Sequence, residues 1–206
     1  MSISEFKKVK ANRQSLANRK LVCGFGVNDS WYKTSNIING KKVKCNAYTA
    51  WRNMIKRCYS EAVHKIRPAY ISVTVCSEWL TFSNFGKWFN ENNITGYDLD
   101  KDIKVKGSNV YSPDTCLFVP RCINALLNDA GANRGKYPLG VSEAKNNKFQ
   151  SFIRIDKKQI RLGYFKTVIE AENSYKKAKN AEILRKCEQY PEFAVYLKQY
   201  LYEVEV

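Results

Sequence analysis

The chain has 206 residues, 44% hydrophobic and 13% aromatic, a composition that can build a buried core and excludes a wholly disordered chain. It carries 35 Lys and Arg against 19 Asp and Glu, a net charge of +16, which favours a polyanionic partner such as nucleic acid over an acidic protein or a membrane. No apolar run is long enough for a transmembrane helix or a signal peptide, so we expect a cytoplasmic protein without a membrane partner. The seven cysteines include no Cys-x-x-Cys pair, which argues against a zinc ribbon and against a disulfide framework.

The positive charge is distributed unevenly. Residues 1–20 carry six basic residues and one acidic residue, which predicts a basic arm, with a solvated tail as the equally weighted alternative. Residues 131–186 carry fourteen basic and five acidic residues, a net charge of +9. Residues 187–206 have a net charge of −3 and an amphipathic pattern, which predicts an acidic C-terminal helix.

The first folded unit is predicted over residues 21–128. Apolar residues at intervals of three and four predict helices, and alternating apolar and polar residues predict strands. In chain order we expect a helix over 47–59, a strand over 70–76, a helix with an aromatic face over 82–89, strands over 97–103 and 110–119, and a short helix over 121–128. The aromatic residues at this spacing are typical of a core.

A second unit is predicted over residues 136–186, after a glycine-rich linker at 129–135. Its predicted elements are strands over 139–143, 148–155 and 159–165, a turn at 156–158, and a helix that opens with a capping box at Thr167 and packs a stripe of small residues, up to Ala181, on the sheet. Alternation places Ile160 and Leu162 inward, and it gives the second and third strands a polar face made of Lys148, Gln150, Phe152, Arg154, Gln159 and Arg161. The fold class predicted for the whole chain is α+β.

The second unit resembles the APETALA2-type DNA-binding domain. The motif residues are Gly140, Val141, Lys148, Phe149, Ser151, Ile153, Arg154, Arg161, Leu162, Gly163, Phe165, Thr167, Glu170, Ala171, Tyr175 and Ala178. The resemblance implies a three-stranded antiparallel sheet packed on one helix, with the sheet in the major groove of DNA. The DNA-binding residues that the resemblance implies by position are Lys148, Gln150, Phe152, Arg154, Gln159 and Arg161. Lys157 and Lys158, in the turn between the two strands, are further DNA-binding candidates. Ser142 and Ala144 stand where that family carries arginines on the first strand.

The first unit resembles phage-type HNH homing endonucleases, in many of which an APETALA2-like domain follows the nuclease domain. The motif residues are Trp51, Met54, Arg57, Cys58, Tyr59, Val75, Cys76, Glu78, Trp79, Phe82, Phe85, Leu99–Ile103, Tyr111–Pro113, Thr115, Cys116, Phe118–Pro120 and Asn124. The resemblance implies a ββα-metal domain with added helices, formed by the predicted strand pair and the short helix after it.

The same resemblance implies a metal site and a catalytic centre. Asp100 and Asn124 match the metal ligands, and Lys101 occupies the position of the catalytic histidine. Thr115 replaces the asparagine that orients that histidine. Asp102 is predicted to be catalytic together with Lys101. It is also a further oxygen donor, and such donors suit a divalent cation such as Mg²⁺. Lys101 could hold a phosphate or stabilise a leaving group. The only histidine, His64, precedes Asp100 by 36 positions.

These patterns leave three functional hypotheses. The first is a double-stranded DNA-binding protein, acting in a bacterial host cell, that resembles an HNH homing endonuclease and cleaves DNA with a metal ion. The second is a transcriptional repressor that kept this layout and lost catalysis, and the third is an RNA-binding accessory protein. The retained Asp100 and Asn124 favour the nuclease, and the replaced histidine and asparagine favour the repressor.

Overall fold

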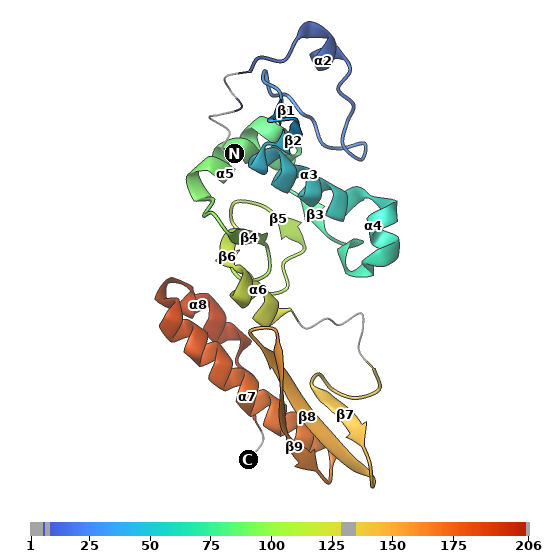
Figure 1. Cartoon of the computed structure of the whole chain (residues 1–206), viewed down its shortest axis with the longest axis vertical. Coiled ribbons are helices and arrows are strands. Elements are labelled where there is room, and N and C mark those ends of the chain that lie inside the picture. Colours follow the sequence, from blue (N-terminus) through green and yellow to red (C-terminus); the bar gives the residue numbers. More distant parts are fainter. Residues whose placement is uncertain (1–5, 7–8, 129–134, 205–206) are drawn as a thin grey trace. The chain divides into compact units, whose positions relative to one another are not determined.

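The computed structural model describes residues 6, 9–128 and 135–204, and it shows a mixed α+β fold, as predicted (Figure 1). The chain divides into two compact units, residues 1–118 and 119–206. Most of the linker predicted at 129–135 lies outside the described residues. By its contacts, the short helix that follows Pro120 belongs to the second unit.

The first unit consists of short helices, 3₁₀ turns and two-residue to four-residue strands. Its elements are α2 (Arg13–Ala17), β1 (Ser35–Ile38), β2 (Lys41–Lys44), α3 (Asn46–Tyr59), α4 (Glu61–Ile66), η1 (Pro68–Tyr70), β3 (Thr74–Val75), η2 (Ser77–Leu80), α5 (Phe82–Asn92), β4 (Tyr97–Asp100) and β5 (Val110–Tyr111). Strand β6 (Leu117–Pro120) follows and spans the division between the units.

The aromatic core of this unit lies between α3 and α5, as the helical spacing predicted. Trp51, Trp79 and Phe82 are almost fully buried, and the Trp51 indole nitrogen donates a hydrogen bond of 2.7 Å to the Trp79 carbonyl. Phe6, within the predicted basic arm, is also buried in this core. Arg19 donates hydrogen bonds of 3.0 Å to the carbonyls of Asn28 and Tyr32. The described part of the arm is therefore attached to the body of the unit.

All three predicted strands of the first unit are wrong in extent, and the strand predicted over 97–103 ends at Asp100. The segment 70–76 begins as a 3₁₀ turn because Pro68 fixes a helical φ, and Ile71 donates to the Pro68 carbonyl at 3.0 Å. Only Thr74–Val75 is extended, and it pairs in parallel with β5. The segment 110–119 is interrupted by a turn, so that β5 pairs with β3 while β6 pairs with β4.

The second unit is a sheet with a long helix. Its elements are α6 (Arg121–Leu127), β7 (Val141–Ala144), β8 (Lys148–Ile155), β9 (Lys158–Phe165), α7 (Val168–Gln189), η4 (Pro191–Phe193), α8 (Ala194–Leu197) and η5 (Lys198–Tyr200). The strands form an antiparallel sheet in the order β7-β8-β9, and α7 runs along it (Figure 1). The three strands and the helix were all predicted from the sequence.

Local chemistry explains where α7 begins and how closely it packs. Thr167 and Glu170 form the predicted capping box, with each side chain accepting a hydrogen bond of 3.2 Å from the other residue's backbone amide. Gly140 has a φ of +77°, and a Cβ built on it would lie 2.1 Å from Cδ2 of Tyr175 on α7. Only glycine permits that backbone conformation with the helix so near.

The buried face of α7 changes character along its length. Ala171 and Tyr175 are buried, as the predicted stripe requires, but Ala181 is exposed and the charged Glu182 is buried instead. Arg185 forms hydrogen bonds of 2.7 and 2.6 Å with the Glu182 carboxylate, which balances that buried charge. The predicted C-terminal helix over 187–206 is not continuous. Residues 187–189 still belong to α7, and a short segment of mixed 3₁₀ and α turns begins at Pro191.

Candidate functional site

The strand register assigns the side chains of the three-stranded sheet to two faces. Directly paired residues share a face, and faces alternate along a strand. Ser151 and Ile153 are buried on the face that packs against α7. The opposite face, called the outer face below, consists of Ser142, Ala144, Lys148, Gln150, Phe152, Arg154, Gln159, Arg161 and Tyr164.

The outer face is positively charged. Lys148, Arg154 and Arg161 are exposed, and none of the nine outer-face positions is acidic. None of these three cations forms an ion pair with a residue that the structure describes. Asp156, in the turn between β8 and β9, has its carboxylate 3.6 Å from Arg185 and 3.9 Å from Lys186. The nearest acid along these two strands is thus balanced by cations of α7.

Neutral contacts order the polar side chains of this face. Gln150 donates a hydrogen bond of 2.9 Å from its amide nitrogen to the Ser142 hydroxyl. The Arg161 guanidinium lies over the Tyr164 ring, 5.3 Å from its centroid. A groove at one end of the face is lined by Glu143, Ala144, Lys145, Asn146, Lys148, Gln150 and Tyr164. These contacts fix the positions of the Gln150 amide and the Arg161 guanidinium, and they leave the positive charge of Arg161 unpaired with any acid among the described residues.

Six of the eight predicted DNA-binding residues share the outer face, and two do not. Lys157 lies in the turn with a φ of +68°. Lys158 pairs with Ile155 and therefore belongs to the face toward α7. A β-bulge between Ser151 and Phe152 leaves Leu162 without a partner on β8 and places Tyr164 on the outer face. The sequence-based reasoning missed Tyr164, although Gly163 inside the predicted strand was a signal for a bulge.

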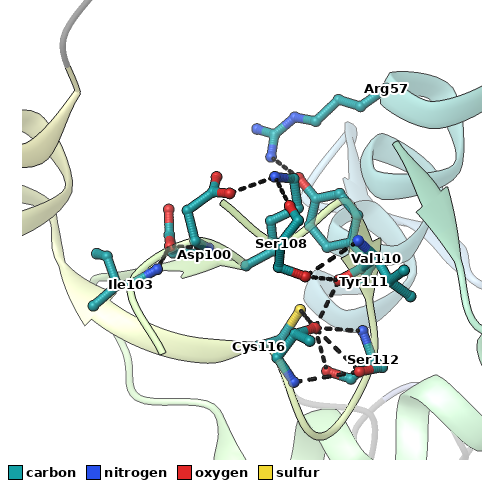
Figure 2. Close-up of polar contacts among 11 residues, drawn as sticks. Arg57, Asp100, Ile103, Ser108, Val110, Tyr111, Ser112 and Cys116 are labelled. Atoms are coloured by element: carbon teal, nitrogen blue, oxygen red, sulfur yellow. Dashed lines mark hydrogen bonds and ion pairs between the residues drawn. The ribbon is translucent and has the colours of Figure 1, made fainter. Parts of the chain in front are cut away.

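The second candidate site is the turn after β4, where Asp100 is bonded to the protein backbone. Its Oδ1 accepts hydrogen bonds of 2.8 Å from the backbone amides of Asp102 and Ile103 (Figure 2). Burial raises the pKa of the Asp100 carboxyl above its ordinary value, although these two amide donors oppose the shift. Asp100 thus stabilises the turn that ends β4.

Lys101, at the position of the catalytic histidine in the resembled family, is buried and bonded within the same turn. Its Nζ lies 2.5 Å from Oδ1 of Asp102 and 2.6 Å from the carbonyl oxygen of Ser108. The ammonium therefore joins the two ends of the segment 101–108. In this arrangement Lys101 acts as an internal cation, with its donors directed at protein oxygens.

Thr115 and His64 are also bonded to the backbone. Thr115 donates a hydrogen bond of 2.6 Å from its hydroxyl to the Val110 carbonyl and accepts one of 3.1 Å from the Ser112 amide. These bonds hold the turn that divides the predicted strand 110–119. A ring nitrogen of His64 lies 3.0 Å from the Arg57 carbonyl. Each side chain has a structural partner.

Three further groups near this turn, two thiols and a phenol, have raised pKa values. Burial raises the pKa of the Cys58 and Cys116 thiols to about 12. Burial also raises the pKa of Tyr111, whose hydroxyl accepts a hydrogen bond of 3.5 Å from Arg57. All seven cysteines are free thiols. The thiols of Cys58 and Cys116 thus lack the lowered pKa of a nucleophilic cysteine.

The implied metal ligands are not brought together within one unit. Asp100 lies in the first unit and Asn124, on α6, lies in the second. Oδ1 of Asp100 already accepts two amide hydrogens, and Oδ1 of Asp102 lies 2.5 Å from the Lys101 ammonium, so each of these two oxygens has a protein partner. No group of three His, Cys, Asp or Glu residues suited to a metal occurs in the described part of the chain. The Asp100–Asn124 site stays a prediction.

Comparisons with known proteins add no further information. No protein-family model matches the chain, and neither a curated protein nor a solved structure matches it. No helix among the described residues is long and apolar enough to cross a bilayer.

Proposed function

We propose that the protein binds double-stranded DNA through the outer face of the β7–β8–β9 sheet. The observation that carries this proposal is the outer face itself, where three exposed cations and two glutamines share one surface without an acidic residue. Such a face suits a polyanion because each phosphate that it neutralises releases counterions. The resemblance of this unit to the APETALA2-type domain supports the same partner.

The side chains suit base recognition in the major groove as well as phosphate binding. A guanidinium such as that of Arg154 or Arg161 can donate two hydrogen bonds to guanine, and a glutamine such as Gln159 can pair with adenine. Phe152 provides an apolar surface for a thymine methyl group. Lys148, at the start of β8, suits a phosphate contact. We therefore propose sequence-preferring rather than uniform binding.

For the first unit we propose a supporting role without catalysis, which corresponds to the repressor hypothesis. Strand β4 pairs with β6, and α6 follows β6 directly, an order that agrees with the strand–strand–helix layout of an HNH domain. However, the residues at the base and orienter positions, Lys101 and Thr115, are both hydrogen-bonded to the protein's own oxygen atoms. We derive no step through a metal ion from this arrangement.

Fluorescence anisotropy with a duplex selected from a random pool tests the proposal. Arg154→Ala and Arg161→Ala should each weaken binding by about 1–3 kcal/mol and relax the base preference, because each removes a base contact. Lys177→Ala is the matched control, since it removes an exposed cation of α7 and leaves the sheet intact. Wild-type affinity in both arginine variants, or a preference for single-stranded or duplex RNA, would contradict the proposal.

The same duplexes distinguish a binder from a nuclease. Incubated with Mg²⁺ or Mn²⁺, they should stay intact. Metal-dependent cutting by the wild type that disappears in Asp100→Ala, with binding retained, would instead support the nuclease hypothesis.

A further inference from the structure

The hairpin formed by β1 and β2 is a basic ribbon on the first unit. The two strands are antiparallel, with Ile37 opposite Lys42 and Ser35 opposite Lys44. Asn39 and Gly40 join them with φ values of +50° and +72°, as in the tight turns whose twist matches paired strands. The outer-face residues of the β7–β8–β9 sheet lie in the other unit, so the hairpin is a separate feature.

The hairpin belongs to a segment without negative charge. Residues 30–60 contain seven Lys and Arg residues and no Asp or Glu. Four of the seven lie in or next to the hairpin, namely Lys33, Lys41, Lys42 and Lys44, and all four are exposed. None of the four forms an ion pair with any residue that the structure describes. Their charges repel one another in the absence of an anion.

The register directs one face of the ribbon away from the core. Val43 is partly buried against the core of the first unit, and its neighbours Lys42 and Lys44 therefore point to the opposite face. Ile37 shares that face and is 72% exposed. The ribbon is fixed at its base by backbone hydrogen bonds. The Cys45 amide donates to the Thr34 carbonyl at 2.9 Å, and the Lys33 amide donates to the Val9 carbonyl at 3.0 Å.

Edge protection alone does not account for this surface. Lysines on exposed strand edges prevent pairing with other chains. Here the cations continue through α3, where Arg52 and Lys56 are partly exposed. An isolated two-stranded ribbon is also marginally stable. A ligand that neutralises the lysines would remove their repulsion and stabilise the ribbon.

We infer that the β1–β2 hairpin is a second DNA-contacting element, in which Lys42 and Lys44 bind phosphates of the duplex. The identity of the partner rests on the proposed function of the sheet. Lysine ammonium groups are compact point charges that suit phosphates, whereas the sheet carries the arginines and glutamines that suit base edges. The hairpin therefore adds affinity without sequence preference, and the sheet supplies the preference.

The test is the salt dependence of duplex binding by Lys42→Gln/Lys44→Gln. Loss of two phosphate contacts should lower the slope of log affinity against log salt by about 1.8. Affinity should fall by the same factor for the selected duplex and for an unrelated one. The control, Lys65→Gln/Lys87→Gln, removes two exposed cations of the same unit from helices outside the hairpin, and its slope should change much less. Far-UV circular dichroism checks that both variants are folded.

The outcomes separate this inference from the proposal on which it rests. If the wild type binds, the sheet variants weaken binding and the hairpin variant keeps the wild-type slope, the hairpin inference is wrong and the sheet proposal holds. If the control lowers the slope as much as the hairpin variant does, binding is diffuse and the inference is equally wrong. If the wild type does not bind DNA at all, the sheet proposal is wrong, and the hairpin inference that rests on it is wrong too.

Discussion

The outer face of the β7–β8–β9 sheet and the turn after β4 are both rich in charged side chains, but they use them differently. In the turn, Asp100 and Lys101 have protein hydrogen-bond partners. On the sheet, Lys148, Arg154 and Arg161 have no acidic partner among the described residues. A polar side chain that is hydrogen-bonded within the protein stabilises the folded state. If the same side chain bound a ligand instead, the protein would lose that stabilisation. The contrast indicates a structural role for the turn, and it supports the proposal that the sheet binds a ligand.

A Gly140→Ala substitution should destabilise the unit that contains the sheet and leave the turn after β4 intact. Of the substitutions considered, it should cause the largest loss of folding stability. The new Cβ would lie 2.1 Å from the Tyr175 ring and 2.6 Å from the Phe152 carbonyl oxygen, at a φ that disfavours alanine. Left-handed strain and overpacking together should destabilise the second unit by about 2–5 kcal/mol. DNA binding should be lost with it.

The tryptophans report on the unfolding of the first unit only, so their fluorescence can be compared with a signal from the whole chain in Gly140→Ala. All four lie between residues 31 and 88, in the first unit. The urea midpoint by far-UV circular dichroism should fall, and the midpoint by tryptophan fluorescence should not. Gly135→Ala is the control, because its new Cβ would have no atom within 4 Å and it should have little effect. A shifted tryptophan midpoint would show that the two units unfold together.

A Lys101→Met substitution tests the structural role of the turn after β4. It keeps most of the buried side-chain volume and removes the bonds to Asp102 and to the Ser108 carbonyl. We expect a loss of about 1–3 kcal/mol in the tryptophan-detected unfolding free energy, as for hydrogen bonds that involve a charged group. Lys65→Met, an exposed change in the same unit, is the control. Unchanged stability combined with weaker DNA binding would mean that Lys101 contacts the ligand.

An Asp100→Asn substitution should give the smallest effect, and one that depends on pH. Burial raises the pKa of Asp100 in the folded state, so the wild type loses stability as the pH rises through that pKa. Asparagine keeps the Oδ1 acceptor without the charge, so the variant should be more stable at about pH 7, with the difference vanishing at about pH 3. Thermal unfolding at the two pH values measures this. Asp114→Asn, an exposed change nearby, should show no such trend.

The second unit could be predicted from the sequence because its structure is specified locally. Strand β8 and the capping box at Thr167 follow from alternation and from residues three positions apart. The polar face was predicted for the same reason. Leu162 is left unpaired at the bulge, so the residues of β9 after it lie on the opposite face from the one that simple alternation predicts. Tyr164 was therefore missed.

The first unit could be predicted less well because its strands depend on distant partners. The pairing of β3 with β5 is not visible in either segment, and both are only two residues long. The β1–β2 hairpin had a signal, the Asn39–Gly40 pair between two short runs, which is typical of a tight hairpin turn. No pattern in the sequence indicated that Lys101 and Thr115 are bonded to the protein, since hydrogen-bond partners depend on the folded backbone.

The parallel pair of β3 and β5 has a consequence for the order of folding. Val75 and Tyr111 can meet only when residues 76–110 close into a loop, and this closure costs chain entropy before the pair contributes any stability. The strands β7, β8 and β9 are joined by short turns, and α7 follows within a few residues. Contacts between near neighbours in sequence form faster than distant ones. The sheet can therefore acquire its native structure earlier than the β3–β5 pair, although the first unit leaves the ribosome first.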